Sequence, residues 1–143
     1  MTAIEAPAPF QVAKVRPQMV ARGKLTSQLA RAGYLNIGVQ VIAPDGGETN
    51  LHSHPGVDSA WMVLGGKAAF YGKGDVLVAE MDKFDVITIP AGTPYWFKAN
   101  SDEPLVILHM TVKDPSIKGS PRIDYAPPIE KPREVIPGVF FEG

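Results

Sequence analysis

The chain has 143 residues with a net charge of −1; 45% of them are hydrophobic, 20% are charged and none is cysteine. This composition suits one globular domain with its own core, and without a block of basic residues we expect no nucleic-acid partner and no membrane partner. Without cysteine, disulfides and zinc–thiolate sites are excluded, so any metal must be bound by imidazole nitrogen and by oxygen.

Residues 1–33 are expected to form an N-terminal arm with a candidate strand, FQVAKV (10–15), and a short helix, KLTSQLARAG (24–33). The opening MTAIEAPAPF lacks the positive and apolar regions of a secretion signal. No apolar run in the chain approaches the ~20 residues of a membrane helix. We therefore expect a cytoplasmic protein.

Residues 34–113 are predicted to form a β-barrel. Glycine and proline separate short segments that are rich in valine, isoleucine and aromatic residues, a pattern typical of strands. The expected strands are 34–44, 59–66, 68–72, 76–82, 84–90, 94–100 and 104–112. Strands of this length at regular spacing indicate a sandwich or barrel, so we expect an all-β fold.

The segment GGETNLHSHPGVDSAWMVLGG (46–66) carries His52, His54 and Asp58. Residues two apart on a strand point to the same face, so the two imidazoles are expected side by side, with Asp58 sharing their parity. Two histidines and one carboxylate form a facial triad typical of non-heme Fe(II). We expect one divalent transition metal and favour Fe(II), while Zn, Mn and Ni accept the same ligands. The alternative is a pair of solvent-facing histidines, because most chance occurrences of His-x-His bind no metal.

The same segment resembles the first motif of the cupin superfamily, which is Gly, five residues, His-x-His, three or four residues, Glu, six residues and Gly. The matching positions, with Asp in place of Glu, are Gly46, His52, His54, Asp58 and Gly65. FDVITIPAGTPYWFKAN (84–100) is similar in part to the second cupin motif, but Tyr95 stands where the family has its third histidine ligand. The resemblance covers about half the chain. It implies a double-stranded β-helix, or jelly-roll barrel, with a bound metal.

Tyr95 has three open roles. A phenol has an unperturbed pKa of ~10, so it binds a metal only after losing its proton. Tyr95 is therefore expected to be a metal-bound phenolate, a general acid or base, or a packing residue in a barrel without metal. We favour the two functional roles, because His52 and His54 are both kept.

The third histidine, His109, alternates along PLVILHMTV (104–112) with a wholly apolar face. We expect that apolar face to point into the core and His109 to lie outside the pocket. A bulge that inverted the parity would instead make His109 a further metal ligand.

Strand parity also predicts the walls of a substrate pocket. Counting from Asp58 and Tyr95, the residues expected to point inward are Ala60, Met62 and Phe97, with Gln40 supplying a hydrogen-bonding amide. By the same count, Trp61 and Trp96 are expected to point outward.

The tail, residues 114–143, carries six prolines and ends in the apolar segment VIPGVFF (135–141). So many prolines exclude a helix or a central strand, and a free tail rarely keeps this many apolar residues in water. We expect an extended arm that packs on the barrel or on a second protomer, and a homodimer.

The leading functional hypothesis is a metal-dependent enzyme for a small-molecule substrate, with a dioxygenase acting on a diketone, phenol or enol favoured. If Tyr95 transfers protons, a lyase or isomerase becomes equally reasonable. The alternative from another class is a non-catalytic barrel that binds a small ligand, which the missing third histidine favours.

Overall fold

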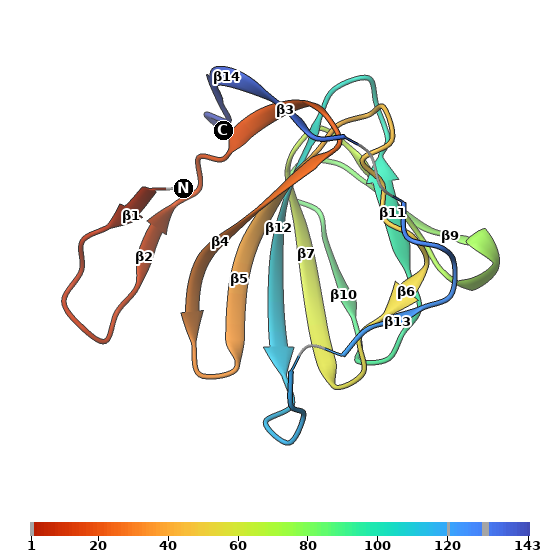
Figure 1. The fold of residues 1–143 in the computed structure, drawn as a ribbon, viewed down its shortest axis with the longest axis horizontal. Helices are drawn as coiled ribbons and strands as arrows, with labels where there is room; N and C mark the ends of the chain where they lie inside the picture. The colour runs from red at the N-terminus through yellow and green to blue at the C-terminus, as the bar shows by residue number, and fades with distance from the viewer. Residues whose placement is uncertain (1, 120, 130–131) are drawn as a thin grey trace.

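The computed structural model describes residues 2–119, 121–129 and 132–143, and in this part of the chain strands predominate and no α-helix occurs (Figure 1). The larger sheet, ordered β10-β7-β12-β5-β4, consists of β4 (Lys24–Ala32), β5 (Leu35–Ile42), β7 (Val57–Gly65), β10 (Val86–Ile89) and β12 (Leu105–Lys113). The smaller sheet, ordered β11-β8-β9, consists of β8 (Ala68–Tyr71), β9 (Leu77–Met81) and β11 (Trp96–Ala99). The all-β class predicted from the sequence is confirmed.

The two sheets pack against each other through one apolar core. Trp61 of β7, Phe70 of β8, Phe97 of β11 and Ile107 of β12 are all buried in it. The ring centroid of Phe97 lies 4.7 Å from that of Trp61 and 4.8 Å from that of Phe70. Aromatic contacts at such distances add to the hydrophobic free energy that closes the barrel.

A second apolar cluster lies on the other face of the larger sheet. Val39 and Val41 of β5 and Val106 of β12 are buried there beneath the chain termini, including Val20 and the partly buried Phe141. The larger sheet is therefore apolar on both faces, since the barrel core covers one and the two arms cover the other.

Residues 24–33 are not helical, which corrects the helix expected there. Lys24–Ala32 form β4, which pairs with β5 along its length, and Gly33 and Tyr34 make a two-residue hairpin turn between them. Gly33 has a φ of +55°, in the left-handed region that such turns require. The pairing with β5 outweighs the helical preference, because a segment this short gains little from forming a helix alone.

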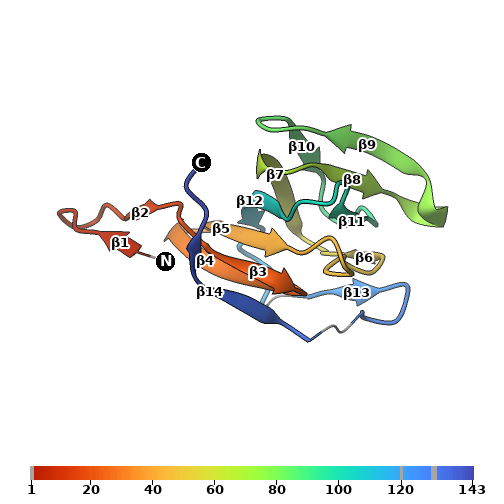
Figure 2. The ribbon, with the colours of Figure 1, turned by 90° about the horizontal axis from the view of Figure 1, so that it is seen from above.

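The strand that follows the N-terminal hairpin and the C-terminal tail both lie against the barrel (Figure 2). The hairpin of β1 (Thr2–Ile4) and β2 (Val12–Lys14) projects to one side, whereas β3 (Gln18–Arg22) pairs with β14 (Glu134–Phe140). Upstream in the tail, β13 (Ile123–Asp124) pairs with β6 (His52–Ser53). A 3₁₀ turn occupies Lys73–Asp75, and no helix in the described ranges is long and apolar enough to cross a membrane.

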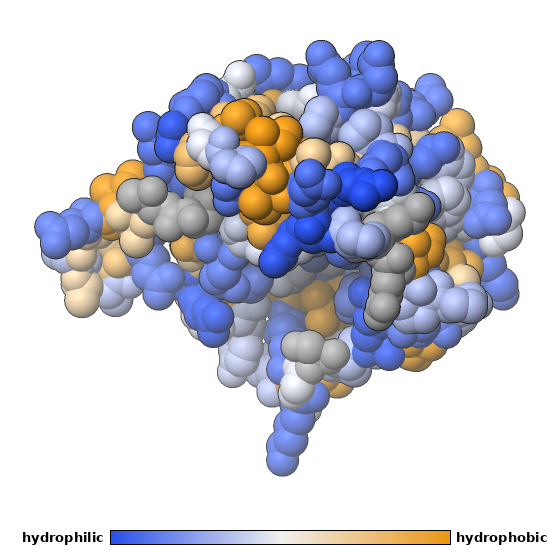
Figure 3. Space-filling model, turned by 45° about the horizontal axis from the view of Figure 1, so that its top comes forward, coloured by the Kyte–Doolittle hydropathy of each residue, from blue (hydrophilic) through white to orange (hydrophobic). Residues whose placement is uncertain are grey.

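The tail, expected to pack on the barrel or on a partner, lies against strands of its own chain. In the space-filling view, polar residues dominate one face of the molecule, and apolar residues are confined to separate patches (Figure 3).

Candidate functional site

The structure brings His52, His54 and Tyr95 together. The rings of His52 and His54 have centroids 4.9 Å apart and are nearly perpendicular. A backbone bridge places Tyr95 beside them, because His52 N donates to Tyr95 O at 3.1 Å and Tyr95 N donates to His52 O at 2.9 Å. The Tyr95 ring centroid consequently lies 4.6 Å from that of His52 and 6.4 Å from that of His54.

A backbone carbonyl fixes the orientation of the His52 ring. Nδ1 of His52 lies 2.6 Å from the carbonyl oxygen of Asn50, which can only accept a hydrogen bond. In the neutral ring Nδ1 therefore carries the proton, and Nε2 carries the lone pair. This arrangement is typical of histidines that bind metals, whose second nitrogen donates to a carbonyl or carboxylate.

Both imidazoles are in the form that binds metals. Burial lowers the pKa of His52 to about 4, an effect that the Asn50 carbonyl partly offsets and the charge of Arg122 reinforces. Burial also lowers the pKa of His54, again with a contribution from Arg122. Both rings are consequently neutral near pH 7, and a neutral imidazole is the ligand that a metal requires.

Asp58 does not join the histidine pair. Its side chain is exposed, and its Oδ1 accepts a hydrogen bond of 2.8 Å from the backbone N of Ala91. The parity count failed because Pro55 and Gly56 form a turn between β6 and β7, with Gly56 at a φ of +72°. A turn resets the alternation of faces, so a count through it predicts nothing about the next strand.

The same error affects the rest of β7, where the odd-numbered residues point into the barrel. Ser59, Trp61 and Val63 are buried, which corrects the outward placement of Trp61. Ala60 and Met62, expected in the substrate pocket, lie on the opposite face. Ala60 and Asp58 line a shallow cavity outside the barrel.

His109 faces the barrel interior, contrary to the expectation that it lies outside the pocket. It is the cross-strand partner of Trp61, and the two rings stack with centroids 3.5 Å apart. The wholly apolar face of β12 misled the prediction, because Val106 on that face packs beneath the chain termini instead of inside the barrel. The pKa of His109 is lowered to about 3, mainly by burial and also by repulsion from His54 and His52 in their protonated forms.

Phe97 points inward, as the parity count predicted, and Gln40 also points inward, as expected for a pocket amide. Phe97 is fully buried in the core. Gln40 lines a small cavity of about 180 Å³ together with His109, and its Oε1 is a buried atom without a hydrogen-bond partner among the described residues. Trp96 points outward, where its Nε1 donates to Asp75 at 2.8 Å.

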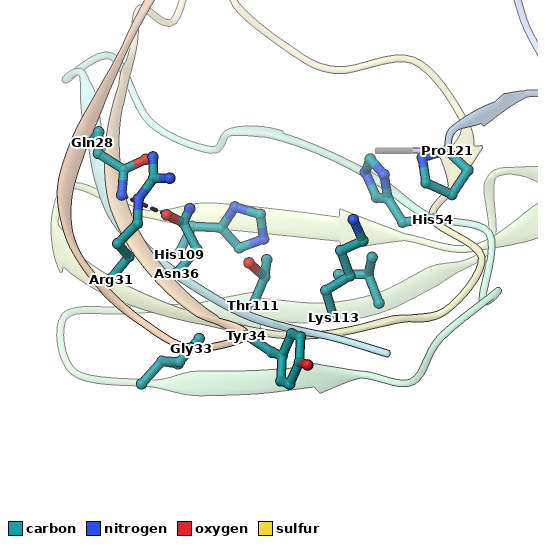
Figure 4. Close-up of a pocket in the computed structure, with 12 residues that line it drawn as sticks. Gln28, Arg31, Gly33, Tyr34, Asn36, His54, His109, Thr111, Lys113 and Pro121 are labelled. Atoms are coloured by element: carbon teal, nitrogen blue, oxygen red, sulfur yellow. Dashed lines mark hydrogen bonds between the residues drawn. The ribbon is translucent and has the colours of Figure 1, made fainter. Parts of the chain in front are cut away.

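A cavity of about 530 Å³ opens beside the histidines (Figure 4). His54 and His109 line its inner wall, whereas Arg31 and Lys113 come from the ends of β4 and β12, and Tyr34 comes from the turn between β4 and β5. This volume lies within the roughly 300–1,000 Å³ of small-molecule sites. Tyr95 lines a separate, mostly apolar cavity of about 310 Å³ between β8 and β10.

Sequence reasoning missed Arg31, Tyr34 and Lys113 as cavity residues. A signal existed in the short spacing Arg-Ala-Gly-Tyr between two apolar segments, which is typical of a hairpin tip. The hairpin was not predicted because residues 24–33 had been assigned to a helix. Lys113 reaches the cavity only through the pairing of β12 with β5, which the sequence did not specify.

Comparison with known proteins decides the family. The sequence model of the cupin domain family matches residues 38–111. This chain belongs to the cupin family. The match runs from within β5 to within β12, which is most of the barrel, and confirms the resemblance seen in the His52–His54 segment. No curated protein matches the chain.

Solved structures share the cupin fold. A protein with a double-stranded β-helix domain from Klebsiella pneumoniae is 16% identical, with a TM-score of 0.61 over 71% of this chain and 79% of that chain. A conserved protein of unknown function from Streptococcus pyogenes is 26% identical, with a TM-score of 0.57 over 68% and 81%. The DMSP lyase DddQ from Ruegeria pomeroyi is 20% identical, with a TM-score of 0.57 over 72% of this chain and 52% of that chain.

Cupins commonly bind a divalent metal, and the residues of this cupin fit one in part. The neutral rings, their spacing and the Asn50 contact suit His52 and His54 as two nitrogen ligands. The expected carboxylate is missing, since Asp58 lies elsewhere. Within the described ranges, no group of three or more His, Cys, Asp or Glu side chains is placed to hold a metal ion. Tyr95 is an oxygen-bearing side chain beside the pair, with its ring centroid 4.6 Å from that of His52.

Proposed function

We propose that this cupin is a metal-dependent enzyme that acts on a small organic molecule bound in the cavity beside His54. One observation carries the proposal: two neutral imidazoles, His52 buried and His54 half-buried, lie with their ring centroids 4.9 Å apart, and His54 lines a cavity of about 530 Å³. Burying a polar side chain costs free energy unless the side chain forms hydrogen bonds or binds a ligand. Packing alone would be served equally well by apolar side chains at both positions.

His52 and His54 would hold the metal, with the Tyr95 phenol as the oxygen group beside them. A bound divalent metal would supply a Lewis acid for a substrate carbonyl or enolate, or would activate dioxygen. Fe(II), Zn, Mn and Ni all accept imidazole nitrogen and oxygen ligands, and we propose that one such ion binds per chain. The Asn50 carbonyl would keep the His52 ring in its ligating orientation.

We favour a lyase or isomerase over the dioxygenase expected from the sequence. The dioxygenase hypothesis depended on a carboxylate beside the two histidines, and Asp58 bonds to Ala91 instead. Burial raises the pKa of Tyr95 to about 12, with smaller opposing effects from Trp61 and Arg122. A phenol with this pKa keeps its proton at neutral pH, so Tyr95 would act as a hydrogen-bond donor to an oxyanion that forms beside the histidines, as in a lyase or isomerase reaction. The fold shared with DMSP lyase DddQ makes elimination the first reaction to assay.

A non-catalytic ligand-binding barrel is the second candidate. It is favoured by the small number of metal-binding side chains gathered around His52 in the described residues. In that case His54 and His109 would only contribute hydrogen bonds to a ligand in the cavity.

Elemental analysis tests the two candidates. The protein is purified without added metal and supplemented in parallel with Fe(II), Zn, Mn and Ni. We expect stoichiometric metal in the wild type and its loss in His52→Ala and His54→Ala. His109→Phe is the matched control, because it removes the third imidazole of the cavity region while keeping a ring, and it retains the metal.

The Tyr95→Phe variant separates the roles of the phenol. A retained metal with a large loss of elimination or isomerisation rate supports a proton donor, and a lost metal supports a ligand. A wild type that stays metal-free under all four supplements contradicts the enzyme proposal and leaves the ligand-binding barrel.

We also propose a homodimer. In the isolated chain the edge strands β9 and β10 leave large apolar side chains exposed, among them Leu77 at 50%, Val78 at 59% and Val86 at 60%. An exposed apolar edge is typical of an interface. Sedimentation of the wild type should give twice the chain mass, and Val86→Lys should shift it towards the monomer. A wild type that sediments as a monomer contradicts the proposal.

A further inference from the structure

We propose that the cavity beside His54 binds a small organic acid, and that Arg31 and Lys113 hold its carboxylate groups. The inference deepens the proposed function, since it assigns the substrate of the same site to a chemical class. It does not depend on the metal, because both cations belong to the protein and lie in the cavity wall.

The charge of the cavity wall is the first argument. Arg31 and Lys113 line the cavity, and no Asp or Glu among the described residues does. Neither of the two forms a salt bridge in the described ranges, whereas other basic side chains do: Arg16 with Glu142, Arg22 with Asp45, Lys67 with Asp82 and Arg122 with Asp124. Two unpaired cations facing one concave site attract an anion and repel a cation.

The hydrogen-bond donors of the wall give the second argument. Gln28 donates to the Oδ1 of Asn36, which leaves the Asn36 amide N–H groups available to the cavity. Arg31 lies beside this amide pair in Figure 4. A guanidinium with a neighbouring amide offers several parallel N–H groups, and a carboxylate accepts such groups in pairs. Tyr34 and Thr111 add hydroxyl groups to the same wall.

The placement of the two cations limits the shape of the ligand. Arg31 and Asn36 lie on one side of the cavity and Lys113 on the other, where its side chain extends toward His54 (Figure 4). Leu35 and Val57 line the space with apolar groups. A short carbon chain with one or two carboxylates fits a cavity that has a cation on each of two sides and apolar groups in its lining.

Calorimetric titration with succinate, succinamate and succinamide tests the proposal. The three probes have nearly the same size and carry two, one and no negative charges. We expect the wild-type protein, as purified, to bind succinate, to bind succinamate more weakly and not to bind succinamide. Arg31→Gln and Lys113→Gln should each weaken succinate binding about tenfold, the usual effect of losing a charged hydrogen bond. Arg22→Gln and Lys98→Gln, which change cations outside the cavity, are the matched controls and should leave it unchanged.

Three results would each overturn the proposal. The first is that succinamide binds as tightly as succinate. The second is that none of succinate, malonate, acetate and benzoate binds, and the third is that the cavity variants bind succinate as the two control variants do. Inorganic phosphate binding more tightly than succinate through the same two residues would replace the organic acid with a phosphate ligand.

Titration of His52→Ala separates this inference from the proposed function. Persistent succinate binding in that variant, with dependence on Arg31 and Lys113, supports the inference even if the wild type holds no metal. Loss of succinate binding in His52→Ala means that a metal, and not the two cations, holds the anion, and overturns the inference.

Discussion

The imidazole of His109 lies flat on the indole of Trp61, with ring centroids 3.5 Å apart and planes 6° from parallel. The two residues are cross-strand partners on β12 and β7, and both face the barrel interior. Nε2 of His109 is a buried atom without a hydrogen-bond partner among the described residues. His109 is therefore held in the neutral form, because a charged ring there would be poorly solvated.

Acid should destabilise the fold through its buried histidines. Burial lowers the pKa of His109 to about 3 and that of His52 to about 4, while an unfolded histidine titrates near ~6.5. As the pH falls below ~6.5, the unfolded chain takes up protons that the folded chain does not, so the free energy of unfolding falls. By linkage each histidine removes about 2 kcal/mol between pH 7 and pH 5.

His109→Phe isolates the contribution of one histidine. Phenylalanine keeps a ring against Trp61 and has no titrating proton, so the loss of stability between pH 7 and pH 5 should be about 2 kcal/mol smaller than in the wild type. Urea unfolding at the two pH values measures this difference. Thr111→Val, on the same face of β12, changes no titratable group and should follow the wild type. A pH dependence of His109→Phe equal to that of the wild type would show that His109 titrates normally in the folded protein.

Asp58 is expected to stabilise a loop and to leave metal binding unaffected. Asp58→Ala removes the acceptor of the Ala91 N–H, which should lower the free energy of unfolding by about 1 kcal/mol. Asp58→Asn keeps an acceptor oxygen, so its free energy of unfolding should fall less than that of Asp58→Ala. Both variants should have the metal content of the wild type in elemental analysis. Metal loss in both variants, with the fold intact, would restore Asp58 as a ligand.

The sequence predicted the features that depend on local patterns. Gly and Pro marked the turns, and valine and isoleucine marked the strands. The spacing of His52 and His54, two positions apart on one short segment, was enough to predict that their rings lie together. The inward direction of Phe97 also followed, because Tyr95 and Phe97 belong to one uninterrupted extended segment.

Features that depend on which distant strands pair could not be predicted from local sequence patterns. The turn at Gly56 broke the parity between His54 and Asp58. The apolar face of β12 was assigned to the core because nothing in the sequence shows that the chain termini cover its outer side around Val106. The cavity was not predicted for the same reason, since Arg31 and Lys113 come to line one cavity only after β4 pairs with β5 and β5 pairs with β12.

The central aromatic cluster should dominate stability. Phe97 is fully buried against Trp61 and Phe70, so Phe97→Ala should lower the free energy of unfolding by about 3–5 kcal/mol. Phe84 is 66% exposed, and Phe84→Ala should change the free energy by about 0.5 kcal/mol or less. Urea unfolding of the two variants checks the contrast. Similar losses in both would contradict the assignment of the core to the barrel interior.

Asn50 should hold the tail segment 122–126 against the histidine strand. Its Nδ2 donates to Asp124 Oδ1 at 2.8 Å and to the carbonyl oxygen of Ala126 at 2.9 Å, and Arg122 donates to its Oδ1. Asn50→Ala removes the hydrogen bonds to all three partners and should lower the free energy of unfolding by about 1–3 kcal/mol. The freed tail should also be cut faster by trypsin after Lys118, which limited proteolysis measures.

Tyr125→Phe is the milder control for the same segment. It removes only the hydroxyl that lies 2.9 Å from the Ser53 hydroxyl. The free energy of unfolding should therefore fall by about 1 kcal/mol, and the rate of trypsin cleavage should rise less than in Asn50→Ala. The Nδ1 contact of His52 uses the backbone carbonyl of Asn50, which Asn50→Ala preserves. A change in metal content together with faster cleavage would therefore mean that the tail itself positions the histidines. Equal cleavage rates in Asn50→Ala and the wild type would mean that the β13–β6 pairing holds the tail without the Asn50 side chain.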